Sequence, residues 1–195
     1  GAAQKALLES IYEDERIDRS RIAYVEAHGT GTAAGDPIET KSIGEVLGHH
    51  NPGEAPLPVG SVKGNLGHLE TGSGMAGLAK VLNVFEHREI PANIQLKNPN
   101  PKIDFKGLGI RVPTQNEPLP KAEGGKGVLA CVNSFGFGGT NAHVLLEEKP
   151  AIVDAEPEFA DGAILPLMIS ARSMESLQAL SRIYCDRLQG KDAAF

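Results

Sequence analysis

The sequence predicts an α/β fold with a mixed sheet. Segments with strand and helix periodicity alternate over residues 1 to 90, and two strands joined by a glycine-rich turn follow near residue 135. Three of the loops that follow strands are rich in glycine, threonine and histidine. In α/β proteins such loops lie at the edge of the sheet where ligands bind, so we expect a functional site there.

The composition is that of a globular chain long enough to bury a hydrophobic core. Of the 195 residues, 41% are hydrophobic and 23% are charged. The net charge of -6 does not provide the basic surface that nucleic-acid binding needs. No apolar run approaches the length of about 20 residues that a membrane span requires, and the two cysteines do not form a disulfide framework. We therefore expect no nucleic-acid partner, no membrane span and a cytoplasmic location.

The first part of the chain predicts a helix, a strand and a second helix. Residues 2–13 carry apolar side chains at helical spacing, and residues 21–27, RIAYVEA, are expected to form a strand. The second helix is expected to open at Asp36 as its cap, with Glu39 completing a capping box. Gly48 is the expected end of this helix.

The next part predicts a short strand over 57–62, a loop over 63–68 and a helix over 69–85. Glycine weakens an isolated helix by about 1 kcal/mol per residue, yet glycines are dense in the first turns of this helix. We therefore expect the helix to be buried with its backbone close to a neighbour. Residues 91–120 are expected to be mostly loop, with one short strand near 108–112.

A hairpin is expected next. Residues 127–135 form a strongly apolar strand, residues 136–141 a sharp glycine-rich turn, and residues 142–147 a returning strand.

The composition changes at Lys149 and Pro150, so we predict two domains, 1–149 and 150–195. The second begins with an acidic linker over 151–162, followed by a strand over 164–170 and an amphipathic helix over 173–189.

The first glycine-rich loop, at 28–32, admits a nucleotide-binding alternative. Gly29, Gly31 and Ala34 satisfy the glycine pattern of a dinucleotide site. The context argues against it, because the helix starts too late and the required acidic residue would fall in a loop at Glu54. A P-loop is excluded, since no Gly-Lys-Ser/Thr sequence follows.

The other two loops also have a structural and a functional interpretation. A lone histidine in a loop is more often structural, but His28 and His68 both lie in loops after strands, the second near Lys63. Neither has a third side chain at metal-ligand spacing, so we expect no metal site. The loop within 133–143 is either a hairpin tip with a buried aromatic ring or a turn that presents N–H groups to a developing anion.

Three motifs together resemble one family. YVEAHGTGTAAGDPIET, GSVKGNLGHLETGSGMAGLAK and NSFGFGGTNAHVLLEE are similar, in order and spacing, to the second half of polyketide-synthase ketosynthase domains. The resemblance covers about residues 1–149 and implies the second half of a thiolase-like fold, layered α/β/α with a mixed sheet. The segment LPLMISARSMESL resembles the start of the linker between a ketosynthase and an acyltransferase, and this implies a short β-α segment.

The resemblance implies a decarboxylative Claisen condensation of acyl and malonyl-type thioesters in polyketide or fatty-acid biosynthesis. His28 and His68 would donate N–H groups to the malonyl thioester and stabilise the enolate, and Lys63 would organise them. Thr30 and Thr32 would bind the phosphopantetheine arm of an acyl carrier protein.

The same resemblance assigns roles to the hairpin turn. The backbone N–H of Phe137 would contribute to an acyl oxyanion hole, and its ring would gate the pocket. Gly136, Gly138 and Asn141 would contact the substrate or its pantetheine arm. No bound cofactor is expected, because substrates arrive on the carrier protein.

The nucleophilic cysteine of the family precedes these motifs and has no counterpart in the 195 residues. Cys131 lies within an apolar strand and Cys185 on the linker helix, and neither has an activating environment. We therefore expect a half-enzyme of the acyltransferase class that needs an N-terminal ketosynthase half.

The expected partners are that half, the acyl carrier protein, a second copy of the completed ketosynthase and an adjacent acyltransferase. The alternative function is that of a non-catalytic structural or docking fragment of a synthase module, although such a fragment would need neither histidine.

Overall fold

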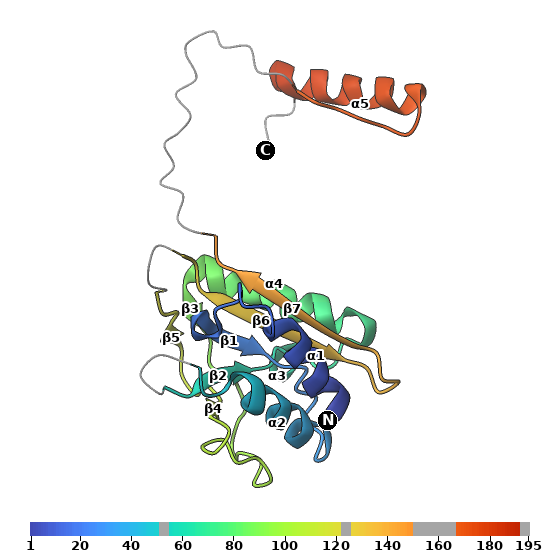
Figure 1. The fold of residues 1–195 in the computed structure, drawn as a ribbon. Coiled ribbons are helices and arrows are strands. Elements are labelled where there is room, and N and C mark those ends of the chain that lie inside the picture. Colours follow the sequence, from blue (N-terminus) through green and yellow to red (C-terminus); the bar gives the residue numbers. More distant parts are fainter. Residues whose placement is uncertain (51–54, 122–125, 150–166, 192–195) are drawn as a thin grey trace. The chain divides into compact units, whose positions relative to one another are not determined.

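The computed structural model describes residues 1–50, 55–121, 126–149 and 167–191. The chain separates into two units, Gly1–Ala151 and Ile152–Phe195, and each is described by itself (Figure 1). No helix in the described part is long and apolar enough to cross a bilayer.

A five-stranded sheet forms the centre of the first unit, in the order β4-β2-β1-β6-β7. Its strands are β1 (Ile22–Glu26), β2 (Leu57–Gly60), β4 (Ile110–Arg111), β6 (Leu129–Phe135) and β7 (Asn141–Glu147). β1 runs parallel to β2 and β6, β2 runs parallel to β4, and β6 pairs antiparallel with β7. The expected mixed sheet and its closing hairpin are thus confirmed. A separate small pair joins β3 (Glu89–Ile90) to β5 (Glu117–Pro118).

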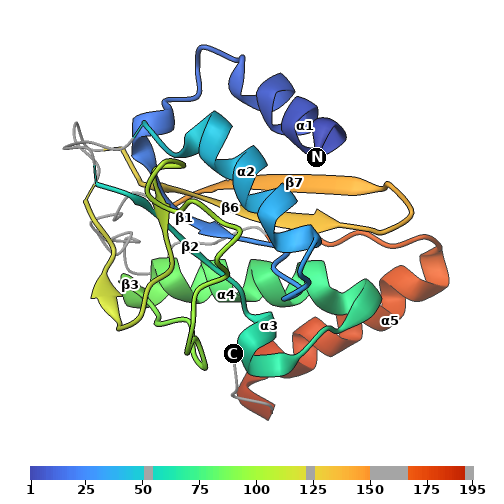
Figure 2. The same ribbon diagram turned by 90° about the horizontal axis from the view of Figure 1, so that it is seen from below.

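Helices cover both faces of this sheet, so the unit has three layers (Figure 2). α1 (Ala2–Tyr12) and α2 (Gly35–Leu47) pack on one face around Leu8, Ile43 and Val25. α4 (Ser73–His87) packs on the other face, where Val81 and Val84 meet side chains of β1 and β6. All five residues of β1 are buried, as expected for a central strand between two layers.

The glycines of α4 allow a close approach to the sheet. A Cβ atom on Gly77 would lie 3.0 Å from Val132 Cγ1 and 3.2 Å from Glu26 Cγ. The expected packing of this helix close to a neighbour is therefore confirmed, and the neighbour is the sheet itself. The expectation that the helix is buried holds for that face only, because Met75 and Leu82 are exposed.

The start of α2 differs from the expected capping box. The helix begins at Gly35, so Asp36 is already inside its first turn and does not cap it. Thr32 supplies the local acceptor instead, since its Oγ1 accepts the Gly35 N–H at 3.0 Å, while Asp36 Oδ1 accepts the Gly31 N–H at 3.1 Å. Glu39 turns away from the helix end toward the loop before it.

The segment expected as a loop over 63–68 contains the short helix α3 (Lys63–Leu66). Its first turn is anchored from the sheet, because Glu26 Oε1 accepts the Val62 N–H at 2.5 Å. A 3-10 turn, Glu70–Gly72, separates α3 from α4. The helix expected to begin at 69 therefore begins at Ser73.

In the second unit the structure describes α5 (Met174–Asp186), which continues as a π-helical turn over Arg187–Lys191. Ser173 caps α5, since its Oγ accepts the Ser176 N–H at 3.2 Å. Residues 167–170 of the strand expected over 164–170 form no strand in the structure. Residues 164–166 lie outside the described residues. The expected linker over 151–162 also lies outside them.

Candidate functional site

Two imidazole rings lie side by side at the carboxyl edge of the sheet. The ring centroids of His28 and His68 are 5.5 Å apart, with the planes at 84°. His28 directly follows β1, and His68 follows the short helix α3 that comes after β2. Because β1 and β2 are parallel neighbours, their following loops converge at one edge. The sheet therefore explains why two histidines far apart in the sequence meet.

A buried carboxylate holds the backbone at His28. Glu39 is only 4% exposed, and its Oε1 and Oε2 accept the N–H groups of His28 and Gly29 at 2.7 and 2.9 Å. Asn133 Nδ2 donates to the same carboxylate at 3.1 Å. Burial raises the pKa of Glu39, and these three donors oppose that effect.

The environment of His28 favours the neutral ring. The pKa of His28 is lowered to about 4, mainly by burial and also by the nearby charges of Lys63 and His68. A neutral imidazole carries one N–H donor and one acceptor nitrogen. Nδ1 of His28 is buried and has no hydrogen-bond partner within the described residues.

The contacts of His68 determine which nitrogen carries its proton when the ring is neutral. Nδ1 lies 2.9 Å from the Glu70 backbone nitrogen, which can only donate, and 3.0 Å from Ser73 Oγ. Nδ1 therefore acts as the acceptor, and a neutral ring carries its proton on Nε2. That N–H is a donor available to a ligand.

Lys63 opens α3 close to the two rings. Burial lowers its pKa, whereas the charges of Glu26 and Glu39 act in the opposite direction. Glu26 is 1% exposed, and it binds Lys80 Nζ at 2.9 Å and accepts the Tyr24 hydroxyl at 2.7 Å. Because Glu26 also anchors the start of α3, it links the position of Lys63 to β1.

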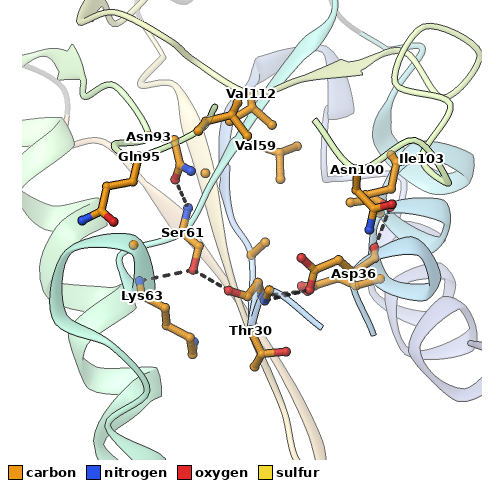
Figure 3. A pocket seen from close by; sticks show the side chains of 18 of the residues that line it. Thr30, Asp36, Val59, Ser61, Lys63, Asn93, Gln95, Asn100, Ile103 and Val112 are labelled. Carbon is orange, nitrogen blue, oxygen red and sulfur yellow. Dashed lines mark hydrogen bonds between the residues drawn. The ribbon is translucent and has the colours of Figure 1, made fainter. Parts of the chain in front are cut away.

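A pocket of about 440 Å³ lies beside these groups, between the loop after β1, the turn after β2 and the segment from 93 to 112. Thr30 and Lys63 both line it, and their side chains extend from the same end of the pocket (Figure 3). Asn93 Oδ1 accepts the Ser61 N–H at 3.0 Å and so ties two of its walls together. Thr32 does not line the pocket, but its Oγ1 is 3.4 Å from Thr30 Oγ1.

The hairpin tip is exposed within this chain. Phe137 is fully exposed, and a Cβ on Gly138 would meet nothing within 4 Å. Gly136 N–H donates to Thr140 O at 2.7 Å, which closes the turn before Asn141 begins β7. The structure therefore brings His28, His68 and Lys63 together, whereas the ring of Phe137 is exposed and takes part in none of the ring contacts of the described residues.

The aromatic ring next to His28 is Phe135, at 6.3 Å between centroids. This strand residue was not singled out from the sequence. Glu39 and Asn133 were also missed as site residues, since Glu39 fits a capping box equally well. The available signal was that a carboxylate on the buried face of an amphipathic helix needs polar partners.

Cys131 does not have the accessible, activated environment of a nucleophile. Cys131 is completely buried, and burial raises its pKa to about 12. Cys185 is exposed on α5 of the second unit. The described residues also contain no cluster of His, Cys, Asp or Glu that could hold a metal ion.

Two family profiles match the chain in succession. "Beta-ketoacyl synthase, C-terminal domain" matches residues 1–97, and "Ketoacyl-synthetase C-terminal extension" matches residues 99–193. The boundary between these profiles differs from the domain boundary that we predict at 149.

Curated relatives and solved structures agree with these profiles. A phenolphthiocerol/phthiocerol polyketide synthase of Mycobacterium tuberculosis is 39% identical over 98% of this chain, which spans 10% of that relative. Ketosynthase twelve of the bacillaene polyketide synthase of Bacillus amyloliquefaciens has a TM-score of 0.69 and 38% identity, covering 76% of this chain and 26% of that one. The module 6 ketosynthase of the Bacillus subtilis bacillaene synthase has a TM-score of 0.70 and 31% identity, covering 100% of this chain and 32% of that one.

Proposed function

The chain belongs to the β-ketoacyl synthase family, as the C-terminal part of a polyketide-synthase ketosynthase domain, and we propose that it supplies the enolate-stabilising half of a decarboxylative condensation site. One observation carries the proposal: the rings of His28 and His68 lie 5.5 Å apart at the edge of the sheet. The proposed class is that of an acyltransferase acting on thioesters.

In the proposed first step, a malonyl-type thioester loses carbon dioxide. The bond to the carboxylate carbon breaks, and its electron pair forms the enolate. The developing oxygen anion accepts N–H donors from His28 and His68, and each donor of this kind contributes about 3 to 4 kcal/mol to lowering the barrier. The lowered pKa of His28 supports this role, because a ring that is neutral near pH 7 can donate its single N–H without losing a proton.

In the second step the enolate carbon attacks an acyl group held on a cysteine. A carbon–carbon bond forms, the carbon–sulfur bond breaks, and the sulfur leaves as a thiolate. We propose that an N-terminal ketosynthase half supplies this cysteine, because Cys131 is completely buried and the motifs that resemble a ketosynthase do not include Cys185. The half-enzyme is then inactive alone.

The remaining predicted residues serve substrate binding in this proposal. Thr30 and Thr32 contact the phosphopantetheine arm of an acyl carrier protein, beside the pocket that Thr30 lines. The N–H of Phe137 forms the acyl oxyanion hole, and its ring gates the site once another chain segment covers the tip. Gly136, Gly138 and Asn141 complete the same wall.

Exposed apolar side chains support the need for a partner. They lie on α3, next to the 3-10 turn and on α4, and they are Leu66, Leu69, Met75 and Leu82. Where such side chains gather, an apolar surface marks an interaction site in soluble proteins. We propose that it packs against the N-terminal half, and that the completed ketosynthase dimerises and works with an adjacent acyltransferase in the cytoplasm.

Reconstitution tests the proposal. The chain is co-expressed with an N-terminal ketosynthase half, and carbon dioxide release from malonyl-loaded carrier protein is measured. His28→Ala and His68→Ala are each expected to lower the rate by about 100- to 1,000-fold. The matched control is His87→Ala, because His87 is exposed at the end of α4, and it should leave the rate unchanged.

A reconstituted complex that forms but releases no carbon dioxide would contradict the catalytic function. That outcome would favour the structural or docking fragment instead.

A further inference from the structure

A line of polar groups leads from the interior of the first unit to the His28 loop. Cys131 Sγ lies 3.1 Å from the Tyr12 hydroxyl, which lies 2.8 Å from His143 Nε2. His143 Nδ1 lies 2.6 Å from Asn133 Oδ1, and Asn133 Nδ2 lies 3.1 Å from Glu39 Oε1. The groups come from α1, β6, β7 and α2, so the line runs along the face of the sheet that α1 and α2 cover.

The direction of each hydrogen bond follows from the chemistry at Glu39. Its carboxylate already accepts two backbone N–H groups, so the amide of Asn133 faces it with the donor Nδ2. The oxygen of Asn133 can then only accept, and His143 must donate from Nδ1.

The other end of the line is fixed in the same way. With the proton on Nδ1, the neutral ring of His143 accepts at Nε2, and the Tyr12 hydroxyl donates to it. The Tyr12 oxygen is left to accept from the thiol of Cys131. Every member therefore donates toward Glu39.

The shared direction of these hydrogen bonds has an electrostatic consequence for Glu39. Glu39 is 4% exposed, and none of the ion pairs in the described part of the chain involves it. Aligned hydrogen bonds polarise one another in a low-dielectric interior, so the line stabilises a buried anion without a contacting cation. Burial lowers the pKa of His143 to about 4, which is consistent with a neutral ring.

We propose that His143 is a positioning residue of the site: in its Nδ1–H form it orients Asn133, which holds the Glu39 carboxylate on the His28 and Gly29 N–H groups. His143 touches neither His28 nor a substrate, and it acts through the other two side chains. The inference deepens the proposed function but depends on it only for the activity measurement below.

The first test uses the unaltered 195-residue chain. Long-range ¹H–¹⁵N correlation spectra at pH 7 distinguish protonated from unprotonated ring nitrogens of histidine. His143 is expected to carry its proton on Nδ1 and to have an unprotonated Nε2. A proton on Nε2, or a doubly protonated ring, would overturn the proposal without any variant being made.

The second test uses a graded series of variants. Asn133→Leu, His143→Phe and Tyr12→Phe remove the line at increasing distance from Glu39. The amide proton signals of His28 and Gly29 are expected to move upfield, most in the first variant and least in the third.

The matched control is Ser42→Ala. Ser42 is buried one turn along α2 from Glu39, and its hydroxyl donates to Ile38 O at 3.0 Å, outside the line. Its removal should leave the two amide signals in place. Equal shifts in the control and in His143→Phe would reduce the role of His143 to general packing and refute the proposal.

Activity separates this inference from the proposed function. In the reconstituted enzyme, His143→Phe is expected to lower kcat for carbon dioxide release about 10-fold with KM for the malonyl carrier unchanged. If the amide signals respond as expected but no protein releases carbon dioxide, the proposed function fails and the positioning role stands. If the enzyme is active and His143→Phe changes neither kcat nor the amide signals, the positioning role fails alone.

Discussion

The loop after β1 and the tip of the β6–β7 hairpin are both glycine-rich, but they differ in how they are held. The His28 loop is fastened from behind by Glu39 and, through it, by Asn133. The tip has its own turn hydrogen bond, yet Phe137 is exposed to solvent on all sides. The loop that carries the proposed enolate site is therefore held in place by contacts within this chain. The turn that carries the proposed acyl oxyanion hole has no such contacts at Phe137.

The largest effect is expected from replacing Glu39, which holds the loop after β1. Glu39→Ala leaves the part-buried N–H groups of His28 and Gly29 without an acceptor, and we expect the free energy of unfolding to fall by about 3 kcal/mol. Urea denaturation measures this. The control is Glu45→Ala on the same helix, whose exposed ion pair with Lys5 should be worth less than about 1 kcal/mol. Equal losses in both variants would mean that Glu39 does not fasten the loop.

A smaller effect is expected from acidification. The pKa of His28 is lowered to about 4 in the folded chain, so between about pH 6.5 and 4 the unfolded chain binds a proton at this ring that the folded chain does not. Stability contributed by the neutral ring is therefore present above pH 6.5 and is lost as the pH falls toward 4. From pH 7 to pH 5 we expect the free energy of unfolding to fall by about 1 kcal/mol. This is less than the full pKa shift would give, because the ring is only half-buried and solvent screens its charge.

Denaturation of His28→Asn at the two pH values provides the comparison. The variant should lose less stability on acidification than the unaltered chain. An identical loss in the two proteins would show that His28 titrates normally.

The smallest effect is expected at the tip. Phe137→Ala should change the free energy of unfolding of the isolated chain by less than about 0.5 kcal/mol, because the ring contacts nothing that folding buries. A loss above about 1 kcal/mol would break the contrast between the two regions. In the reconstituted enzyme the same variant should slow acyl transfer while carbon dioxide release from the malonyl carrier continues.

Much of the fold was readable from the sequence because its signals are local. The strand pattern of residues 21–27 predicts β1, which is buried on both faces in the structure. The apolar run and the glycines of residues 127–141 predict the hairpin. The role of Glu39 was not readable, since its partner Asn133 lies 94 positions away and the pattern after Asp36 imitates a capping box. The two histidines were identified from their place in loops after strands and from the resemblance of their motifs to ketosynthases, whereas the exposure of Phe137 was not predicted.

The parallel pairing of β1 with β6 also constrains the order of events during synthesis. Val25 and Glu26 find their partners, Cys131 and Val132, only after about a hundred further residues have been made. At about 5 to 20 residues per second, a ribosome takes roughly 5 to 20 s to deliver them. Throughout that interval one flank of β1 lacks its neighbouring strand and Glu39 lacks its amide donor, so the support of the His28 loop is completed only late in synthesis.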